Sequence, residues 1–381
     1  MKYYMIAGEA SGDLHGSNLI KGIKEVDSQA QIRCWGGDLM KEAGGDLVKH
    51  YKEGAIMGFV EVVANLGKIS RNLNDCKRDI MEYNPDVVVL IDYPGFNFRI
   101  AEFAKKNGLR VFYYIAPKVW AWKEKRVHRL KKFVDKLFII FPFEIEYFRK
   151  WGIDAIYRGN PLLDSVDNYS RANESREEFF ARTGLDATKE SVALLAGSRK
   201  GEIKYLLPRM MEVARKFPDN QFIMACAPSM EREFYESIIG KECNNIKLLF
   251  GETYSILRHC RAAIINSGTA SLEAALIGVP QVVCYGGNEI SYQIAKRVVK
   301  LKYISLANLI MDRGLFKELI QHDCNPTLIS QELEKLLHDD AYRGKMMEDY
   351  AQVREVLGGK GASAKVAKAM YDELDKMINN R

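Results

Sequence analysis

A turn of small residues near the middle of the second half carries the groups whose chemistry is easiest to infer. An apolar run at 262–265 precedes the turn at 267–269, and an apolar stretch typical of a helix follows at 270–277. Free backbone N–H groups and the positive end of the helix dipole at such a turn suit an anion such as a diphosphate. Glu273, one turn into the helix, could accept two neighbouring hydroxyls, such as those of a ribose. Most turns of this type bind nothing, so the turn alone leaves the function open.

Two glycine-rich loops and one aspartate also stand where apolar runs end. Residues 8–13 (GEASGD) follow the first apolar run, and residues 197–202 (GSRKGE) follow the run at 191–196. Neither loop has the spacing of the dinucleotide fingerprint or of the P-loop, so neither a nicotinamide cofactor nor ATP is indicated. The run at 86–91 ends in Asp92. Open α/β sheets place their chemistry at the carboxyl ends of strands, so Asp92 is a candidate catalytic residue.

Strands and helices must alternate to position these loops, and the sequence shows that alternation twice. Short apolar runs separated by amphipathic segments predict an α/β fold with two Rossmann-like domains and C-terminal helices. We expect an N-terminal domain over 1–165, a C-terminal domain over 175–355 and a C-terminal helix over 356–381, with a polar linker near 160–174. The predicted strands are 2–7, 31–35, 86–91, 110–115, 136–140, 191–196, 221–225, 246–250, 262–265 and 281–284. The predicted helices include 14–26, 59–80, 175–182, 270–277, 327–338, 341–357 and 362–378.

Composition restricts the class of protein. With 47% hydrophobic and 28% charged residues over 381 positions, the chain has the composition of a soluble globular protein and enough material for two cores. Its seven cysteines are scattered, without a CxxC pair or His/Cys ligand spacing, which favours reduced core residues in a cytoplasmic protein and argues against a structural zinc. The N-terminus does not read as a signal peptide, and no run approaches the roughly 18 apolar residues of a spanning helix. We therefore expect any membrane contact to be made from the surface.

The net charge of +6 is concentrated in one segment. Residues 118–136 contain eight basic side chains against two acidic ones, so their local charge equals that of the whole chain. With Trp120 and Trp122 in the same segment, it could face nucleic acid, anionic lipid or a phosphorylated substrate, or form an ordinary solvated helix face. No helix-turn-helix, RNP or zinc-finger pattern accompanies it, so we expect no nucleic-acid partner.

An amphipathic helix is predicted over 59–80. Its apolar residues fall within a stripe roughly 120° wide, and basic residues lie beside that stripe. Such a stripe usually faces a protein core, whereas basic flanks are typical of a helix that lies at a membrane interface. The residues that would contact lipid are Val62, Val63, Leu66 and Ile69.

Eight segments, in order and spread over nearly the whole chain, share their pattern with one enzyme family. They are GEASGDLHG (8–16), MGFVEV (57–62), IDYPGFN (91–97), PKVWAWKEKRV (117–127), LLAGSRKGEI (194–203), SGTASLEAAL (267–276), AKRVVKLKYISLANLI (295–310) and KELIQHDCNP (317–326). They resemble the lipid-A-disaccharide synthases, glycosyltransferases of GT-B type with two facing Rossmann-like halves.

The resemblance implies a reaction and a place in the cell. A 2,3-diacylglucosaminyl unit would pass from UDP-2,3-diacylglucosamine to the 6-hydroxyl of 2,3-diacylglucosamine 1-phosphate, giving UDP and the β-1,6 disaccharide 1-phosphate of lipid A. The enzyme would act as a peripheral protein on the inner face of the bacterial inner membrane, within lipopolysaccharide biosynthesis and lipid metabolism.

The resemblance also implies roles for individual residues. The family's aspartate falls on Asp92 and the acid of its N-terminal loop on Glu9, so one of these two carboxylates is expected to be the general base. Other motif positions are expected to bind substrate: Ser11, Gly197, Ser198, Arg199, Gly268, Thr269, Glu273 and Asn308. From the basic segment, Lys118 and Arg126 are expected to hold the acceptor phosphate or lipid headgroups.

An inverting mechanism is consistent with these residues. The base accepts the proton of the acceptor hydroxyl while the diphosphate leaves from the opposite face of the anomeric carbon, and N–H groups with Arg199 stabilise its growing charge. The absence of a DxD pair at a strand end predicts independence from metal, and no cofactor is expected.

Two alternatives remain open from the residues. The first is a UDP-sugar 2-epimerase of the same two-domain architecture, which would need no surface for acyl chains. The second is a non-catalytic module that binds a membrane surface, which Asp92 and the several anion-binding turns disfavour.

Overall fold

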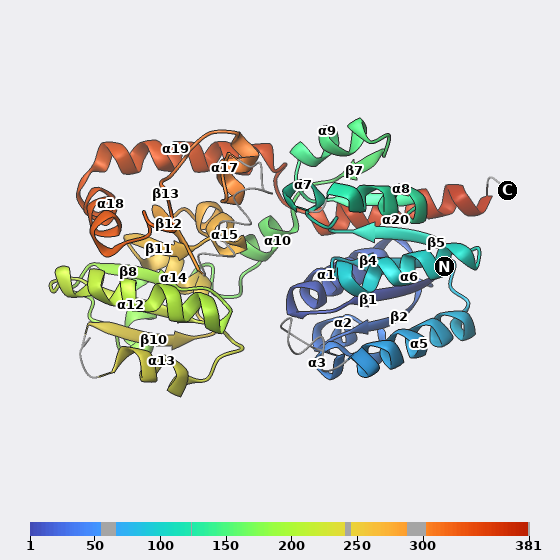
Figure 1. The fold of residues 1–381 in the computed structure, drawn as a ribbon, viewed down its shortest axis with the longest axis horizontal. Helices are drawn as coiled ribbons and strands as arrows, with labels where there is room; N and C mark the ends of the chain where they lie inside the picture. Colours follow the sequence, from blue (N-terminus) through green and yellow to red (C-terminus); the bar gives the residue numbers. More distant parts are fainter. Residues whose placement is uncertain (55–65, 123, 241–244, 288–301, 380–381) are drawn as a thin grey trace. The chain divides into compact units, whose positions relative to one another are not determined.

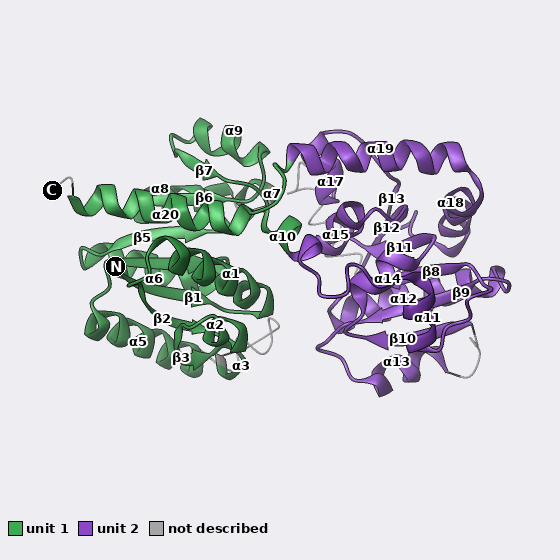
Figure 2. Cartoon of the chain, turned by 180° about the vertical axis from the view of Figure 1, so that it is seen from behind, with its two compact units in different colours: residues 1–164, 357–381 green, residues 165–356 purple. Residues whose placement is uncertain are grey.

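The chain folds into two compact units, each a parallel β-sheet covered by helices (Figure 1). Unit 1 contains residues 1–164 together with 357–381, and unit 2 contains residues 165–356 (Figure 2). The predicted α/β fold with two Rossmann-like domains is confirmed. The structure, a computed structural model, describes residues 1–54, 66–122, 124–240, 245–287 and 302–379.

Seven parallel strands form the sheet of unit 1 in the order β3-β2-β1-β4-β5-β6-β7. Its central strand β4 has the sequence VVVLI and is buried throughout, as expected for a strand covered by helices on both faces. The strands are β1 (Lys2–Ala7), β2 (Gln31–Gly36), β3 (Asp46–His50), β4 (Val87–Ile91), β5 (Arg110–Tyr114), β6 (Lys136–Ile139) and β7 (Ala155–Tyr157).

The helices of unit 1 connect these strands, and the last helix of the chain returns to pack against the first. That contact is close, because a Cβ atom on Gly22 of α1 would lie 2.8 Å from the Cβ of Ala367 in α20. The Asp164 carboxylate accepts the N–H groups of Gly361 and Ser363, at 2.7 and 2.8 Å, and so caps the start of α20. The helices are α1 (Ala10–Val26), α2 (Asp38–Glu42), α3 (Tyr51–Gly54), α5 (Leu66–Tyr83), α6 (Pro94–Lys106), α7 (Val119–Trp122), the 3₁₀ turn η1 (Glu124–Arg126), α8 (Val127–Phe133), α9 (Phe143–Lys150), α10 (Pro161–Asp167, across the unit boundary) and α20 (Ala362–Asn379).

Unit 2 repeats the plan with six parallel strands in the order β10-β9-β8-β11-β12-β13. The strands are β8 (Ser191–Leu195), β9 (Gln221–Cys226), β10 (Ile246–Phe250), β11 (Ala262–Asn266), β12 (Gln281–Tyr285) and β13 (Glu318–Ile320). The helices are α11 (Arg176–Thr183), α12 (Lys200–Lys216), α13 (Arg232–Ile239), α14 (Thr253–His259), α15 (Thr269–Ile277), α17 (Leu306–Met311), α18 (Pro326–His338) and α19 (Asp340–Val356).

Each sheet has a point at which the order of its strands reverses. In unit 1 it lies between β1 and β4, and in unit 2 between β8 and β11. Loops at the carboxyl ends of two such strands diverge to opposite faces of the sheet and leave a crevice, where open α/β sheets bind their ligands. The loops that the sequence singles out for chemistry begin at these four strand ends.

The glycine-rich stretch 8–13 is not the loop that was predicted. Helix α1 begins at Ala10, not near residue 14, and Glu9 is its N-cap residue. The glycines allow close packing of this helix: a Cβ on Gly12 would lie 3.1 Å from the Cβ of Ala7, and one on Gly16 would lie 2.6 Å from the sulfur of Met40. The expected linker also differs, since its first part is the helix α10.

The state of the cysteines and the length of the apolar helices were also expected from the sequence. Six cysteines among the described residues are free and buried, as predicted for reduced core residues. No helix in the described ranges is both long and apolar enough to cross a bilayer.

Candidate active site

The loops after β1 and β4 meet at the reversal point of unit 1. Ala7 pairs with Ile91 in the last register position of the two strands, so Gly8 and Asp92 leave the sheet side by side. The Tyr93 ring covers Gly8 so closely that a Cβ on residue 8 would lie 2.2 Å from the Tyr93 Cγ. Glycine is therefore required at position 8 by the aromatic ring that packs over it.

The backbone holds Asp92 in an uncommon conformation. Its φ is +43°, and that of Tyr93 is +47°, a region that non-glycine residues rarely occupy. The Asp92 N–H donates to Tyr114 O at 3.0 Å, and the Asp92 carbonyl accepts from the Tyr113 hydroxyl at 2.6 Å and from Asn97 Nδ2 at 2.8 Å. Several contacts thus compensate for the strain, as is common where a side chain must be held for chemistry.

Burial and charge act together on the Asp92 carboxyl. Burial, with the nearby charge of Glu9, raises the pKa of Asp92 to about 6, while Lys118 and the Tyr93 N–H act in the opposite direction. A carboxylate with a pKa close to the working pH is suited to accept a proton. Glu9 and Asp92, the two carboxylates expected to include the base, are therefore close enough for the charge of Glu9 to act on Asp92.

Ser11 and Asp13 have separate functions in the first turn of α1. Ser11 is exposed, and its hydroxyl lies 3.4 Å from Glu9 Oε1, a long hydrogen bond. The buried Asp13 carboxylate accepts from Gly37, Leu39 and Met40 N–H groups at 2.8–3.1 Å, which caps α2. Asp13 is therefore a structural acid, whereas Ser11 is free to meet a ligand.

Some side chains of the basic segment pack against the protein, and others are exposed to solvent. Lys118 is exposed at the end of β5. Arg126 and Arg129 lie over the Phe98 ring, 5.9 and 5.0 Å from its centroid, and Arg129 also pairs with Glu102 at 3.3 Å. Both arginines thus cover apolar surface, and Lys118 is the cation that acts on Asp92.

A cavity of about 350 Å³ occupies the reversal point of unit 2. It lies at the carboxyl ends of β8, β9 and β11 and the start of α15, where backbone N–H groups and the helix dipole favour an anion. Six residues expected to bind substrate line it: Gly197, Ser198, Arg199, Gly268, Thr269 and Glu273. The structure therefore brings the two predicted anion-binding turns of this unit into one pocket.

Glu202 is a pocket residue whose role was not predicted. Its Oε2 accepts the N–H groups of Ser198 and Arg199 at 3.1 and 3.3 Å, and its Oε1 accepts from the Arg199 guanidinium at 3.1 Å. A carboxylate thus occupies backbone N–H donors of this loop, and it also binds the guanidinium that was expected to stabilise the diphosphate. The position of a glutamate three residues after the helix N-cap was the available signal, because it is the capping position.

The Glu273 carboxylate faces the same pocket. Tyr254 donates its hydroxyl proton to Glu273 Oε1 at 2.7 Å. Burial raises the pKa of Glu273, and the hydrogen bond from Tyr254 opposes that rise. Tyr254 was not predicted, and no local pattern indicates it, because the two residues are 19 positions apart on different helices.

Asn308 does not join the pocket. Its side chain is 0% exposed. The Asn308 Oδ1 accepts from Leu315 N–H at 2.8 Å, and Nδ2 donates to Glu318 Oε1 at 2.8 Å and to Phe316 O at 3.2 Å. The Asn308 side chain is thus held by hydrogen bonds inside the fold and does not line the pocket, and its contact with substrate stays a prediction.

The residues expected to contact lipid are only partly within the described chain. Val62, Val63 and the Leu66 side chain lie outside it. Ile69 is half-buried and lines a small cavity of about 40 Å³. Farther along α5, Leu73 and Ile80 pack into the core of unit 1. Leu73 and Ile80 thus agree with the core-facing alternative that the sequence left open, and contact of Val62, Val63, Leu66 and Ile69 with lipid stays a prediction.

Comparison with known sequences decides the family. The family model described as lipid-A-disaccharide synthetase matches residues 3–370. Lipid-A-disaccharide synthases from Geobacter sulfurreducens and Syntrophus aciditrophicus are 36% and 37% identical over 378 and 368 residues. The alignments cover 98% and 95% of this chain, and 97% and 95% of those proteins. The chain belongs to the lipid-A-disaccharide synthase family.

Membership in the lipid-A-disaccharide synthase family confirms the resemblance seen in the motifs. It also confirms that the chain is a glycosyltransferase of the kind that forms the lipid A disaccharide. The substrates are accordingly a UDP-sugar and a lipid A precursor.

Solved structures share the fold without deciding the activity. The UDP-GlcNAc 2-epimerase from Neisseria meningitidis, bound to UDP-GlcNAc, superimposes with a TM-score of 0.70 at 13% identity, covering 98% of this chain and 100% of that one. The calicheamicin glycosyltransferase CalG4 gives a TM-score of 0.54 at 16% identity, covering 98% of both chains. One architecture hosts an epimerase and a glycosyltransferase, so the sequence relatives, not the fold, separate these alternatives.

Proposed function

We propose that this glycosyltransferase uses Asp92 as its general base and the pocket of unit 2 as its UDP site. The donor is UDP-2,3-diacylglucosamine and the acceptor is 2,3-diacylglucosamine 1-phosphate, the substrates that the family implies. One observation carries the assignment of the base: Asp92 lies at the reversal point of its sheet with a pKa raised to about 6.

The proposed chemical step uses these groups in turn. The acceptor 6-hydroxyl attacks the anomeric carbon of the donor, and its proton passes to the Asp92 carboxylate. The bond between that carbon and the oxygen of the β-phosphate breaks, and UDP leaves with the electron pair. The negative charge of Glu9 raises the pKa of Asp92 and so makes it a stronger base. Glu9 itself accepts no proton in this scheme.

The leaving diphosphate gains negative charge, and the pocket of unit 2 offers donors for it. Gly268 and Thr269 supply backbone N–H groups at the start of α15, and Arg199 supplies a guanidinium. Arg199 is 82% exposed and is paired with Glu202 at the rim, so its side chain can turn to the phosphate without disturbing the core. Glu273 accepts the ribose hydroxyls in this scheme.

The acceptor phosphate and the membrane involve unit 1. We assign the 1-phosphate to Lys118, an exposed cation whose charge lowers the pKa of Asp92, and to Arg126 of the same basic segment. Both substrates carry acyl chains, so the enzyme must take them from a bilayer surface. Residues around Val62 and Val63, with the positive charge of 118–136, are proposed to bind the inner face of the inner membrane as a peripheral contact.

The direct test is incubation of the purified protein with both acylated substrates. The expected products are UDP and a disaccharide 1-phosphate in equal amounts. A parallel incubation with unacylated UDP-N-acetylglucosamine tests the epimerase alternative, which the shared fold brings forward. Conversion of that sugar nucleotide to its 2-epimer, without disaccharide from the acylated pair, would overturn the proposal.

A further inference from the structure

The first turn of α14 connects the nucleotide pocket to the segment that begins unit 2. Thr253 lines the pocket, Tyr254 donates to the Glu273 carboxylate, and Ser255 is fully buried on the other side. Glu252, the N-cap residue of this helix, points to two arginines. Four consecutive residues therefore link the pocket to a polar cluster outside it.

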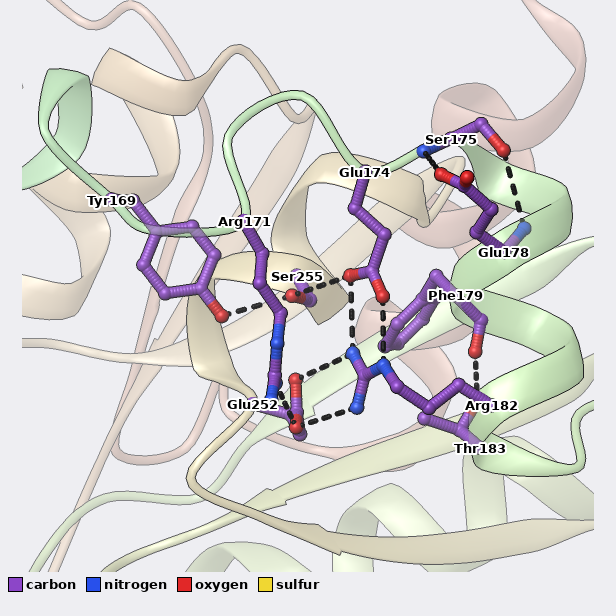
Figure 3. Close-up of polar contacts among 10 residues, drawn as sticks. All are labelled: Tyr169, Arg171, Glu174, Ser175, Glu178, Phe179, Arg182, Thr183, Glu252 and Ser255. Atoms are coloured by element: carbon purple, nitrogen blue, oxygen red, sulfur yellow. Dashed lines mark hydrogen bonds and ion pairs between the residues drawn. The ribbon is translucent and has the colours of Figure 1, made fainter.

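That cluster is built around Arg182 (Figure 3). Its guanidinium binds Glu174 through Nε at 2.7 Å and Nη2 at 3.1 Å, and it binds Glu252 through Nη1 at 2.8 Å and Nη2 at 3.0 Å. Arg171 pairs with the same Glu252. Two cations and two carboxylates thus balance in charge, and the bidentate geometry fixes their positions. We name Arg171, Glu174, Arg182 and Glu252 the linker cluster.

Ser255 and Tyr169 connect the linker cluster to Tyr254. The Ser255 hydroxyl donates to Glu174 Oε2 at 3.2 Å. Since a serine has one hydroxyl proton, the 2.9 Å contact between Tyr169 and Ser255 is donated by the tyrosine. The Tyr169 ring meets the Tyr254 ring edge to face, with centroids 5.3 Å apart and an interplanar angle of 66°. The Tyr254 ring is therefore held by the Tyr169 ring, while its hydroxyl binds Glu273.

We infer that Tyr254 is a positioning residue, which orients the Glu273 carboxylate for the ribose hydroxyls, and that the linker cluster holds Tyr254 through Tyr169 and Ser255. The inference rests on the proposed function, in which this pocket takes UDP. Tyr254 occupies Oε1 of Glu273, so the carboxylate cannot rotate freely and Oε2 is the oxygen assigned to the ligand. The start of unit 2 is thereby tied to the recognition of the nucleotide.

The test compares UDP with 2′,3′-dideoxy-UDP, which lacks both ribose hydroxyls, by calorimetry on the full-length protein. Tyr254→Phe keeps the ring against Tyr169 and removes the hydroxyl. We expect it to weaken UDP about tenfold, while 2′,3′-dideoxy-UDP changes less than about twofold. Tyr342→Phe is the matched control, because Tyr342 also donates to a glutamate, Glu332, in the same unit but away from this pocket. It should bind both nucleotides as the wild type does.

A pH series adds a readout that a merely structural residue would not move. The hydrogen bond from Tyr254 lowers the pKa of Glu273, so its removal should raise that pKa. The pH below which UDP binding weakens should therefore move upward in Tyr254→Phe and stay unchanged in Tyr342→Phe. For the linker cluster, Tyr169→Leu removes both the ring contact and the hydroxyl, and we expect about threefold weaker UDP with the dideoxy nucleotide again unchanged.

The outcomes separate the inference from the proposed function. If Glu273→Gln and the wild type bind UDP equally, or the wild type does not bind it, the assignment of the pocket fails. If Glu273→Gln weakens UDP but Tyr254→Phe does not, or weakens both nucleotides equally, Tyr254 does not position the carboxylate. If the ratio of the affinities for UDP and 2′,3′-dideoxy-UDP is the same in Tyr169→Leu as in the wild type, the linker cluster does not hold Tyr254.

Discussion

Trp120 Nε1 donates a 2.9 Å hydrogen bond to Oε1 of Glu144, a carboxyl group that is 1% exposed. The other oxygen accepts the N–H of Phe141 at 3.1 Å. Burial raises the pKa of Glu144 to about 7, and these N–H donors, with Lys118, oppose the rise. The segment that carries Lys118 is thus anchored to α9 by a buried acid whose charge changes near neutral pH.

The first prediction concerns this anchor. Trp120→Phe removes a donor to the carboxylate, which raises the folded-state pKa of Glu144 and leaves the unfolded state unchanged. The loss in unfolding free energy should therefore be larger at pH 8, about 1.5–3 kcal/mol, than at pH 5.5, where the neutral acid loses about 1 kcal/mol. Urea unfolding at both pH values measures it. Trp35→Phe, at an indole whose Nε1 has no hydrogen-bond partner among the described residues, should cost the same at both.

The second prediction concerns the base. Asp92→Asn keeps the backbone hydrogen bonds of residue 92 and removes the proton acceptor, so kcat should fall by about 10²–10⁴ while UDP affinity stays the same. Asp86→Asn, at the opposite end of the same strand region, is the control, because its carboxylate binds the Lys2 N–H at 2.7 Å. Near-normal turnover in Asp92→Asn would assign the base to Glu9 instead.

The third prediction concerns pH. The base must be ionised, so kcat/KM of the wild type should fall as the pH drops through about 6, the pKa of Asp92. Lys118 lowers that pKa, so Lys118→Gln should move the acidic limb to higher pH. Lys21→Gln, on the exposed surface of α1, should leave the limb in place. An unchanged limb in Lys118→Gln would show that a different group controls it.

The fourth prediction concerns the leaving group. Arg199→Gln should weaken UDP by about 1.5–3 kcal/mol, roughly 10- to 150-fold, because a charge-assisted hydrogen bond to the diphosphate is lost. Arg149→Gln is matched to it, since Arg149 forms the same kind of exposed pair with Glu146 three positions away, in unit 1. Equal UDP affinity in both variants would remove Arg199 from the site.

The fifth prediction concerns the membrane. Replacing Val62, Val63 and Leu66 with serine should release the protein from anionic vesicles without lowering its melting temperature, and wild-type binding should weaken with salt. Leu73→Ser is the contrast, because Leu73 packs against the core of unit 1 and its loss should lower the melting temperature. A destabilised triple variant that still binds vesicles would place those three residues in the core as well.

Most of the strands could be predicted from the sequence because central parallel strands are continuous apolar runs. The three that were missed, β3, β7 and β13, are all edge strands of their sheets. They are short or half-exposed, as in AIY and ELI, and an edge strand needs no apolar face on each side. Their pairing depends on the neighbouring strand, which local sequence does not reveal.

The site divides in the same way. Asp92 and Glu273 could be selected as candidates from local position, the first after a strand and the second one turn into a helix, whereas Arg199 was selected through the resemblance to the family. The role of Tyr254 depends on a contact between two helices, which no local pattern shows. The role of Glu202 depends on the preceding loop, whose N–H groups donate to the Glu202 carboxylate. The burial of Asn308 could not be predicted, because a buried amide and an exposed one are identical in sequence and only packing distinguishes them.

The cap that Asp164 places on α20 has a consequence for the architecture of the gene. Asp164, the last residue of unit 1 before unit 2 begins, binds the N–H groups of residues 361–363. The chain therefore leaves unit 1 and returns to it at adjacent points. In the sequence, unit 2 thus lies between the two segments of unit 1, and hydrogen bonds within unit 1 join those segments. Exchange of unit 2 between relatives would need two junctions, at 164/165 and at 356/357, and would leave the contact of Asp164 with residues 361–363 intact.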